Sequence, residues 1–494
     1  MACIEQGLVE GPLELLPGCI HLIKTSNKIS YFRGTWRSKR AFTRFMRKEL
    51  VFIIVLVISG APCLTAQTID SANRSGWSNH FQLTVINQIH SGFKTAYSGA
   101  NSLSDSVEPA ATSVTTTLFL GRRLWKGAAI YANPEVSGGR GLSYSVGVAG
   151  ALNGETYRIG NPEPVLSLSR AYFQQTFPLG HTDYEDVTDK LNQVAERLPT
   201  HRITITAGKY AMADFYDVNT YNHDPRSAFL NWSLMSNGAW DYPADTKGYT
   251  EGLIVEWHTP AWAIRLSSVA VPVVANHPKM EYVFGKAHSE TAEFERDMKI
   301  GTHPGVIRLL FSYTASRAPS YKAGLQALQT GDATLLNVIS GNAEGGSYGG
   351  NKTGIGLNME QELTDNIGAF ARVGWNDGQH ASWAFTEIDQ TAHVGLSFKG
   401  TPWWRSDDVV GVAAVVNGIS AEHRSFLKAG GYGFIIGDGT LNYGHESIVE
   451  TYYNARLYSH VYFTFDYQMV TNPGYNRDRH GPVSVFAFRG HIEY

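Results

Sequence analysis

Arginines occur in the middle of segments in which polar and apolar side chains alternate. In the stretch VIRLLFSYT, Arg308 is on the polar side, whereas Leu309 and Phe311 are on the other. An arginine presents five fixed hydrogen-bond donors and keeps its charge, while a neighbouring carboxylate accepts hydrogen bonds. Such a face suits weak contacts with hydroxyl groups, and it equally suits ion pairs that brace a wall. The residues assigned to this polar face are Arg170, Arg202, Arg265, Arg308, Arg372, Arg456, Arg489, Glu360, Glu450 and Asp466.

The elements that must position these side chains are segments of roughly ten residues with a period of two. In the C-terminal VSVFAFRGHIEY, Phe486 and Phe488 share one face, and Arg489 and His491 share the other. Charges in the middle of strands fit a water-filled interior better than the solvent face of a soluble sheet. About sixteen such segments lie near 80–90, 111–122, 128–135, 165–177, 201–209, 249–258, 261–271, 288–298, 304–314, 353–363, 366–375, 390–399, 408–416, 447–457, 461–470 and 483–494.

The connections between these segments alternate in length. One side has short turns such as TDN at Thr364, and the other side has long connections. The long ones include residues 91–110, 136–164, 210–248, 315–352 and 417–446. Short periplasmic turns with long outer loops are typical of outer-membrane barrels, which an even number of strands closes. The sequence therefore predicts an all-β fold: a transmembrane antiparallel up-and-down β-barrel of about sixteen strands with short periplasmic turns and long extracellular loops.

Two connections have a helical period instead. Residues 178–200 should form a short turn, but their apolar positions repeat at helical spacing. These positions are Val187, Leu191, Val194 and Leu198. We expect a small periplasmic helix here, the alternative being a miscounted strand. The outer segment 320–340 also reads as helical, and it could fold into the lumen or cap the rim of the barrel.

The N-terminal part has the order of a secretory signal. From Met46 a basic pair precedes an apolar run from Leu50 to Ile58, and small residues follow up to Ala66. We expect residues 46–66 to be a signal peptide, residues 1–45 a non-native extension, 67–79 a linker and 80–494 the barrel. A single membrane anchor is the alternative for the apolar run.

Composition restricts the function classes. All three cysteines, Cys3, Cys19 and Cys63, precede the expected cleavage point, so the exported chain would have neither thiols nor disulfides. Residues 67–494 carry 32 Lys and Arg against 40 Asp and Glu, a net charge of −8, which argues against nucleic-acid binding. Charged residues make up 17% of the chain, below the roughly 25% usual for soluble domains.

Motifs for catalysis and cofactors are weak. The GGSYG around Ser347 matches a nucleophile pattern but lies in a glycine-rich loop without a following helix. The glycines of 430–439 lack the strand and helix of a dinucleotide site. Histidines show neither an H-x-x-x-H pair nor cysteine partners. We therefore expect no catalytic residues, no metal site and no cofactor.

Several long blocks resemble the OprB-type carbohydrate-selective porins. They are YSGANSL (97–103), GRRLWKGAAIYANPEVSGGRGL (121–142), VGVAGALNGE (146–155), AFLNWSLMSNGAWDYPADTKGY (228–249), HRSFLKAGGYGFIIGDGTLNYGHE (423–446) and DYQMVTNPGYNRDRHGPVSVF (466–486). The resemblance covers about 82–494, apart from the insertion at 178–200. It implies a barrel of the bacterial outer membrane through which mono- or disaccharides diffuse passively, with the polar face as the sugar path.

The resemblance also implies partners. They are small carbohydrates, outer-membrane lipid, the barrel assembly machinery through the C-terminal strand at Tyr494, and further copies of the chain in a homo-oligomer. Two other classes remain as alternatives: an outer-membrane barrel enzyme resembling a lipase, and a binding or adhesion barrel that acts through its loops.

The outer loop 210–248 is rich in aromatic residues. Trp232 adjoins Leu230 and Leu234, so we expect it to pack the loop onto the wall. Trp240 and Tyr242 are flanked by glycine and aspartate, so we expect their rings to face the pore. The loop aromatics assigned to the channel mouth are Trp232, Trp240, Tyr242 and Tyr475.

Overall fold

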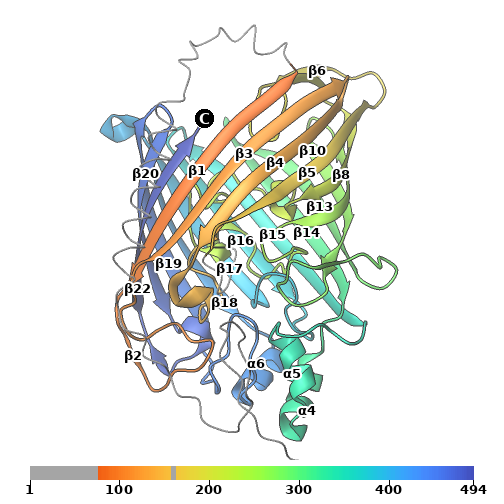
Figure 1. The fold of residues 1–494 in the computed structure, drawn as a ribbon. Coiled ribbons are helices and arrows are strands. Elements are labelled where there is room, and N and C mark those ends of the chain that lie inside the picture. The colour runs from red at the N-terminus through yellow and green to blue at the C-terminus, as the bar shows by residue number, and fades with distance from the viewer. Residues whose placement is uncertain (1–75, 157–162) are drawn as a thin grey trace, which may run out of the picture. The chain divides into compact units, whose positions relative to one another are not determined.

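Sixteen strands form a closed antiparallel barrel in the computed structural model, which describes residues 76–156 and 163–494 (Figure 1). Each strand pairs with its neighbours in the chain, and β1 pairs with β22 to close the wall. The strands of the wall are β1 (Trp77–His90), β3 (Ala111–Trp125), β4 (Ala128–Gly139), β5 (Val165–Pro178), β8 (Arg202–Tyr210), β9 (Thr250–His258), β10 (Trp262–Val269), β13 (His288–Ile300), β14 (His303–Ser316), β15 (Gly350–Thr364), β16 (Ile367–Asn376), β17 (Gln390–Gly400), β18 (Arg405–Gly418), β19 (Glu446–Tyr458), β20 (Val461–Thr471) and β22 (Val483–Glu493).

The predicted sixteen-stranded barrel is confirmed. Because β1 begins at Trp77, the last residues of the predicted linker 67–79 belong to that strand. The predicted extension 1–45 and signal peptide 46–66 lie outside the described residues. Within those residues, no helix is both long and apolar enough to cross a membrane.

Strand pairing keeps the two faces of the wall distinct. Phe465 on β20 pairs with Phe488 on β22, and both rings are exposed on the outside at 41% and 43%. The adjacent Thr464 and Arg489 also pair, and both are fully buried on the inside. A shift of the register by one residue would move the charges outward, so the alternation of side chains fixes the pairing.

The two ends of the barrel differ. At the turn end, β13 and β14 are joined by residues 301–302, β15 and β16 by 365–366, and β19 and β20 by 459–460. At the loop end the connections are long, and they carry the shorter elements. These are β2 (Lys94–Thr95), η1 (Leu142–Ser145), η2 (Met212–Asp214), α3 (Trp232–Met235), β11 (Val271–Pro272), β12 (Met280–Glu281), α4 (Tyr321–Thr330), α5 (Ala333–Ile339), α6 (Ala421–Lys428), η4 (Pro473–Tyr475) and β21 (Arg479–His480); η3 (Thr401–Trp403) is at the turn end.

The helix predicted within 178–200 is wrong. Residues 184–199 form a hairpin, here called the turn-end hairpin, of β6 (Tyr184–Val187) and β7 (Glu196–Pro199). Val187 and Leu198 lie on the two facing strands, whereas Leu191 and Val194 lie in the tip between them, so the four apolar positions are not on successive helical turns. The sixteen wall strands are unaffected, because Pro178 of β5 still pairs with Arg202 of β8.

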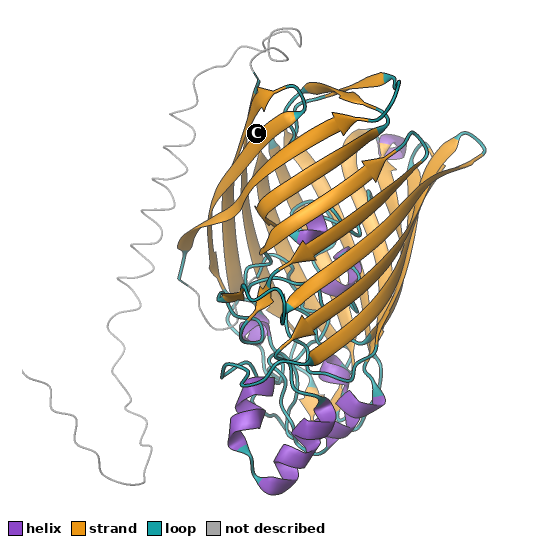
Figure 2. Cartoon of the chain, turned by 90° about the vertical axis from the view of Figure 1, so that its right-hand side faces the viewer, coloured by secondary structure: helices purple, strands orange, loops and turns teal. Residues whose placement is uncertain are grey.

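The predicted helical segment 320–340 is confirmed as α4 and α5. Ser320 caps α4 by accepting a hydrogen bond from the backbone of Ala323, and Gly331 ends the helix with a φ of +73°. Both helices lie with α6 beyond the strands at the loop end (Figure 2). Their apolar faces join one hydrophobic cluster with loop residues such as Trp383. They therefore cap the rim and do not enter the lumen.

Candidate functional site

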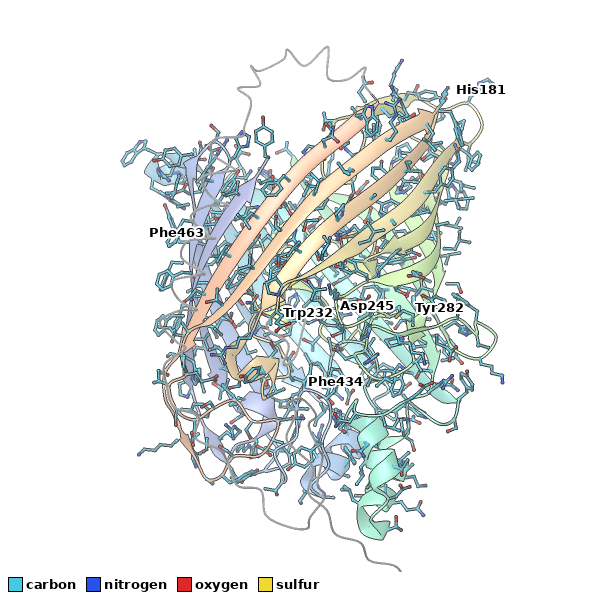
Figure 3. The ribbon with its side chains drawn as sticks, viewed as in Figure 1. His181, Trp232, Asp245, Tyr282, Phe434 and Phe463 are labelled. Atoms are coloured by element: carbon cyan, nitrogen blue, oxygen red, sulfur yellow. The ribbon has the colours of Figure 1, made fainter. Side chains whose placement is uncertain are left out.

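The interior is narrowed by residues 211–249, the connection between β8 and β9, here called the lumen loop. Most of its residues are buried, and it contains the short helix α3. Its Trp232 and Asp245 lie within the outline of the wall (Figure 3). Irregular backbone is tolerated at this depth because it is surrounded by protein.

Asp217 attaches the lumen loop to one side of the wall. Its carboxylate accepts hydrogen bonds from Arg372 Nε at 2.8 Å and from Asn358 Nδ2 at 2.9 Å. It also accepts the backbone N–H of Asn237 within the loop at 2.8 Å. The Asp217 N–H donates to Glu293 on β13 at 2.7 Å. This one residue connects the loop to three wall strands.

The opposite side of the wall holds the loop through its backbone. Glu450 accepts hydrogen bonds from the N–H groups of Leu230 and Asn231. Arg489 donates to the carbonyl oxygens of Pro225 at 2.7 Å and Ala228 at 2.8 Å. Buried charges are tolerated when they are hydrogen-bonded in this way.

Arg226 gives the lumen loop a third attachment, to the wall near β1 and β4. Its guanidinium donates to Gln82 Oε1 at 2.7 Å, to Glu155 Oε1 at 3.1 Å and to Glu135 Oε2 at 3.4 Å. The side chains of Glu135 and Glu155 are almost fully buried. The loop is thus fixed by charge-assisted bonds on three sides.

A cavity of about 440 Å³, here called the lumen cavity, remains between the lumen loop and the wall formed by β1, β3 and β5. Polar groups and aromatic rings both line it. The polar members are Gln82, Glu155, Arg170, Gln174, Asn192, Gln193, Asp214, His223, Asp224, Arg226, Lys247 and Tyr249, and the large rings are Phe119, Tyr172, Phe215, Trp232 and Tyr242.

Arg170 and Asp214 form the most regular pair in the lumen cavity. Arg170 Nε and Nη2 each lie 2.6 Å from a carboxylate oxygen of Asp214, a two-pronged contact. The ring of Tyr249 lies 5.3 Å from the guanidinium, and its hydroxyl donates to Glu135 at 3.0 Å. Lys247 Nζ donates to Ser167 Oγ at 2.9 Å. Donors, acceptors and ring faces therefore meet within one cavity.

Burial favours the neutral form of three titratable side chains in the lumen loop. It raises the pKa of the Tyr242 and Tyr249 phenols well above the ordinary value, so both remain neutral hydroxyls. Burial also lowers the pKa of His223, and the positive charge of Arg372 lowers it further. The imidazole of His223 is therefore neutral at neutral pH.

Of the ten side chains predicted to line the lumen path, only Arg170 lines the lumen cavity. Arg372, Arg489, Glu450 and Glu360 hold the lumen loop instead, Glu360 by accepting the N–H of Thr220. These four side chains bond across the interior to the loop, so they are not presented to a solute.

The remaining five are in the wall or at the turn end. Arg265 contacts Glu256, Glu293 and Glu295, while Arg308 contacts Glu295 and Glu360. Arg202 pairs with Glu185 of the turn-end hairpin, Arg456 pairs with Asp407, and Asp466 accepts from Gln468. Each of the four arginines therefore has a carboxylate partner within the protein.

The aromatic residues of the loops differ from the prediction in which of them line the lumen cavity. Trp232 and Tyr242 line the lumen cavity, their rings stacked 5.7 Å apart between centroids. Trp240, which we expected to face the pore, packs against Tyr216 and Tyr242 and is not among the residues that line this cavity. Tyr475 is fully buried in the cluster below the rim helices, where its hydroxyl donates to the Glu387 carbonyl at 3.1 Å.

Sequence reasoning missed the polar residues that the lumen loop itself supplies. Asp214 ends the three-residue helix η2, and Arg226, Lys247 and Tyr249 lie in irregular backbone, so no period shows which way these side chains point. The one available signal was the presence of charges in a segment that is otherwise rich in buried aromatic residues.

The turn-end hairpin closes part of the lumen cavity. Leu191, Asn192 and Gln193 at its tip are among the lining residues. The tip is held by inward-facing wall residues: His80 contacts Asp189 at 3.1 Å, and the Tyr131 hydroxyl accepts the N–H of Val194 at 3.3 Å. The hairpin is therefore folded under the barrel rather than extended away from it.

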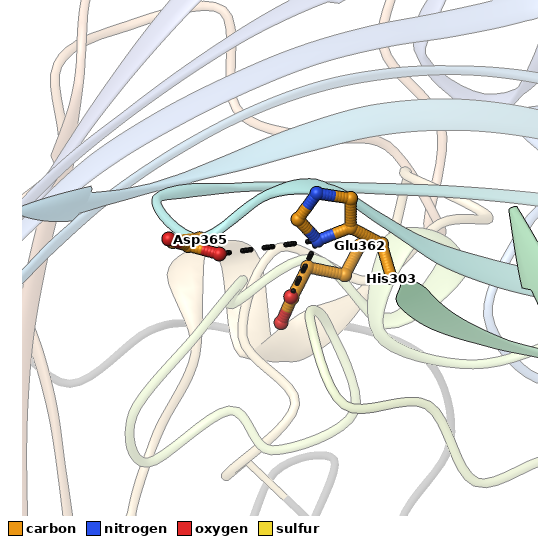
Figure 4. A group of neighbouring side chains, drawn as sticks. All are labelled: His303, Glu362 and Asp365. Carbon is orange, nitrogen blue, oxygen red and sulfur yellow. Dashed lines mark hydrogen bonds and ion pairs between the residues drawn. The ribbon is translucent and has the colours of Figure 1, made fainter. Parts of the chain in front are cut away.

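A group of possible metal ligands lies at the turn end, although no metal site was predicted. His303 Nδ1 is 3.0 Å from Glu362 and 3.9 Å from Asp365 (Figure 4). No spacing in the sequence indicates this group, because His303 begins β14 whereas Glu362 and Asp365 lie at the end of β15 and in the turn after it, about sixty residues further along the chain. None of the three lines the lumen cavity, and the Asp365 side chain is 93% exposed.

An apolar outer surface, a polar interior narrowed by an inward loop, and short turns opposite long loops define an outer-membrane porin. The chain belongs to the OprB family of carbohydrate-selective porins, whose family model matches residues 112–494. Its location is accordingly the bacterial outer membrane, with the turn end on the periplasmic side and the loop end outside.

A solved porin structure shows the same fold. The high-pH structure of OprB from Pseudomonas putida has a TM-score of 0.60 and 15% identity, covering 85% of this chain and 94% of that one. The low-pH structure of the same protein has a TM-score of 0.45 and 12% identity over 85% and 93% of the two chains. OccAB1 from Acinetobacter baumannii has a TM-score of 0.42 and 8% identity over 85% and 97%. No curated protein matches the sequence.

Proposed function

We propose that this porin passes small neutral sugars by passive diffusion through the lumen cavity. The observation that carries the proposal is the lining of that cavity, where the Arg170–Asp214 pair and Tyr249 lie with the ring faces of Trp232 and Tyr242. A sugar has hydroxyl groups around its edge and apolar ring faces, so this mixture complements it.

The lining of the lumen cavity also suits release of a bound sugar. The charged groups already have partners within the protein, so a sugar exchanges hydrogen bonds rather than filling one strong vacant site. Conduction requires contacts that are weak enough to break at each step. The cavity volume of about 440 Å³ is within the range of small-molecule sites.

The two alternatives have less support. The GGSYG serine, Ser347, is in the exposed part of the loop between α5 and β15, away from any strand-to-helix elbow. An adhesion barrel would need only its loops, and the mixed lining of an interior cavity would then have no use. Assembly through Tyr494 and homo-oligomerisation remain predictions.

Liposomes containing the protein should swell in isotonic monosaccharide and disaccharide and should remain unchanged in a large polysaccharide. The physical reason is that the lumen cavity admits a small sugar but not a wide polymer. Swelling is followed by light scattering, with empty liposomes as the control. Ion conductance without swelling in any small sugar would rule out the sugar path, and absence of both would favour the adhesion alternative.

Trp232→Leu should weaken the block of ion current by sugar by about 2- to 10-fold, the effect of losing one aromatic contact. Trp240→Leu is the matched control, because it removes the same ring from the same loop but away from the lumen cavity. We expect it to leave the block nearly unchanged. Equal effects of the two substitutions on the block would show that Trp232 acts only through packing.

A further inference from the structure

We infer that this porin has a second sugar subsite, outside the lumen, which takes up neutral saccharides before they enter. The site is a cavity of about 430 Å³ at the loop end, here called the outer cavity. The inference rests on the proposed sugar path, because this subsite would supply that path with its ligand.

The outer cavity lies between several separate parts of the loop end. Leu328 of α4 and Leu336 of α5 form one side. The glycine-rich segment 430–434 after α6 forms another, and it includes Phe434 (Figure 3). Asn101 of the first long loop completes the wall. The volume is close to that of the lumen cavity, so both can hold a ligand of the same size.

The chemistry of the outer cavity differs from that of the lumen. Among the described residues that line it there is no Asp, Glu, Lys, Arg or His. Its polar side chains are three amides and two hydroxyls, and its rings are those of Tyr432 and Phe434. Neutral amides and hydroxyls both donate and accept hydrogen bonds, while the apolar faces suit a sugar ring. A charged ligand would find no counter-ion in this lining.

The glycine-rich wall is rigidly built. The buried Glu387 carboxylate accepts the N–H groups of Ile435 at 2.7 Å and Ile436 at 2.8 Å. A Cβ on Gly433 would stand 1.6 Å from that carboxylate, so only glycine fits there. Asn101 Nδ2 donates to the Gly433 carbonyl at 2.8 Å. The wall is thus set before a ligand arrives, which reduces the entropy cost of binding.

Two polar groups in this cavity have no hydrogen-bond partner among the described residues. The side-chain amide of Asn337 and the hydroxyl of Tyr432 make no hydrogen bond to any other residue that the structure describes. Both residues are at least partly exposed, so water occupies their bonds until a ligand with hydroxyl groups replaces it. They are therefore the groups that we expect to contact the saccharide.

The test is block of ion current by maltose, added from either the extracellular or the periplasmic side of a planar bilayer holding the full-length porin. Asn337→Ala combined with Tyr432→Phe should lower the association rate from the extracellular side by about 3- to 10-fold, the usual value of one or two hydrogen bonds. Block from the periplasmic side and conductance in salt alone should stay unchanged. Gluconate, a sugar acid, should show no sensitivity to the double substitution.

Two further variants distinguish a failure of the outer subsite from a failure of the sugar path. Gln326→Ala removes an exposed amide from α4 outside the outer cavity and should behave as wild type. Arg170→Gln acts in the lumen and should weaken block from both sides. If Arg170→Gln has this effect but the double substitution has none, the outer subsite is refuted and the sugar path stands. If maltose never blocks the wild-type channel, the sugar path and the subsite both fail.

Discussion

Asp217→Ala should raise the single-channel conductance severalfold. The substitution leaves the guanidinium of Arg372, which is 1% exposed, without its carboxylate and removes the acceptor for the Asn237 N–H. Breaking a buried ion pair from one side costs about 3–5 kcal/mol. Release of the lumen loop from the wall lets water reach Arg372 and relieves that cost, while the wall strands remain paired with one another. Planar-bilayer recording measures the change.

Asp217→Asn is the graded control, since an amide oxygen keeps an acceptor but not the charge. Its conductance should lie between those of the wild type and the alanine variant. Thermal unfolding, followed by gel mobility, should show a folded barrel in both. An alanine variant with a folded barrel and wild-type conductance would mean that Asp217 is not what holds the lumen loop across the channel.

Removing the turn-end hairpin should also increase conductance and should reduce the residence time of sugar in the channel. Replacing residues 183–200 by a short turn withdraws Leu191, Asn192 and Gln193 from the lumen cavity. The wall should survive, because Pro178 of β5 and Arg202 of β8 are already paired at the base of the hairpin. Single-channel recording with sugar added from the periplasmic side measures both quantities.

The matched control for the hairpin is the exposed ion pair Asp186–Arg197, whose side chains are 82% and 70% exposed. Replacing both by alanine changes the hairpin but not its tip, so conductance should remain that of the wild type. If the deletion leaves conductance unchanged, the hairpin is not a boundary of the conducting path. The lumen loop, without the hairpin, would then determine the width of the conducting path.

The strands could be predicted because their side chains alternate between two very different surroundings. Phe465 is outside, the neighbouring Thr464 and Asp466 are inside, and the same alternation occurs in β22 around Arg489. A period of two survives in a single sequence without any knowledge of partners. The number of strands and the ends at which turns and loops lie follow from it.

The partners of the inward charges could not be predicted in this way. Glu450 bonds the backbone of Leu230, which is 220 residues away in the chain, and any residue with an N–H could take that place. The sequence of the lumen loop has neither a strand period nor a helical period. It therefore contains no pattern that would indicate that Trp232 lines the lumen cavity and Trp240 does not. The helix predicted for the turn-end hairpin is wrong because its apolar residues have helical spacing by coincidence, although they are divided between the two strands and the tip that joins them.

The way in which the lumen loop is held has a consequence for redesigning the channel. Glu450 and Arg489 bind main-chain N–H and carbonyl groups of residues 225–231, and Glu360 and Glu293 bind main-chain N–H groups of Thr220 and Asp217. Main-chain groups are the same whatever the side chain. Apart from Arg226 and Asp214, whose side chains themselves bond outside the loop, the side chains of this loop that face the cavity can therefore be exchanged to suit another solute while the main-chain attachment is preserved.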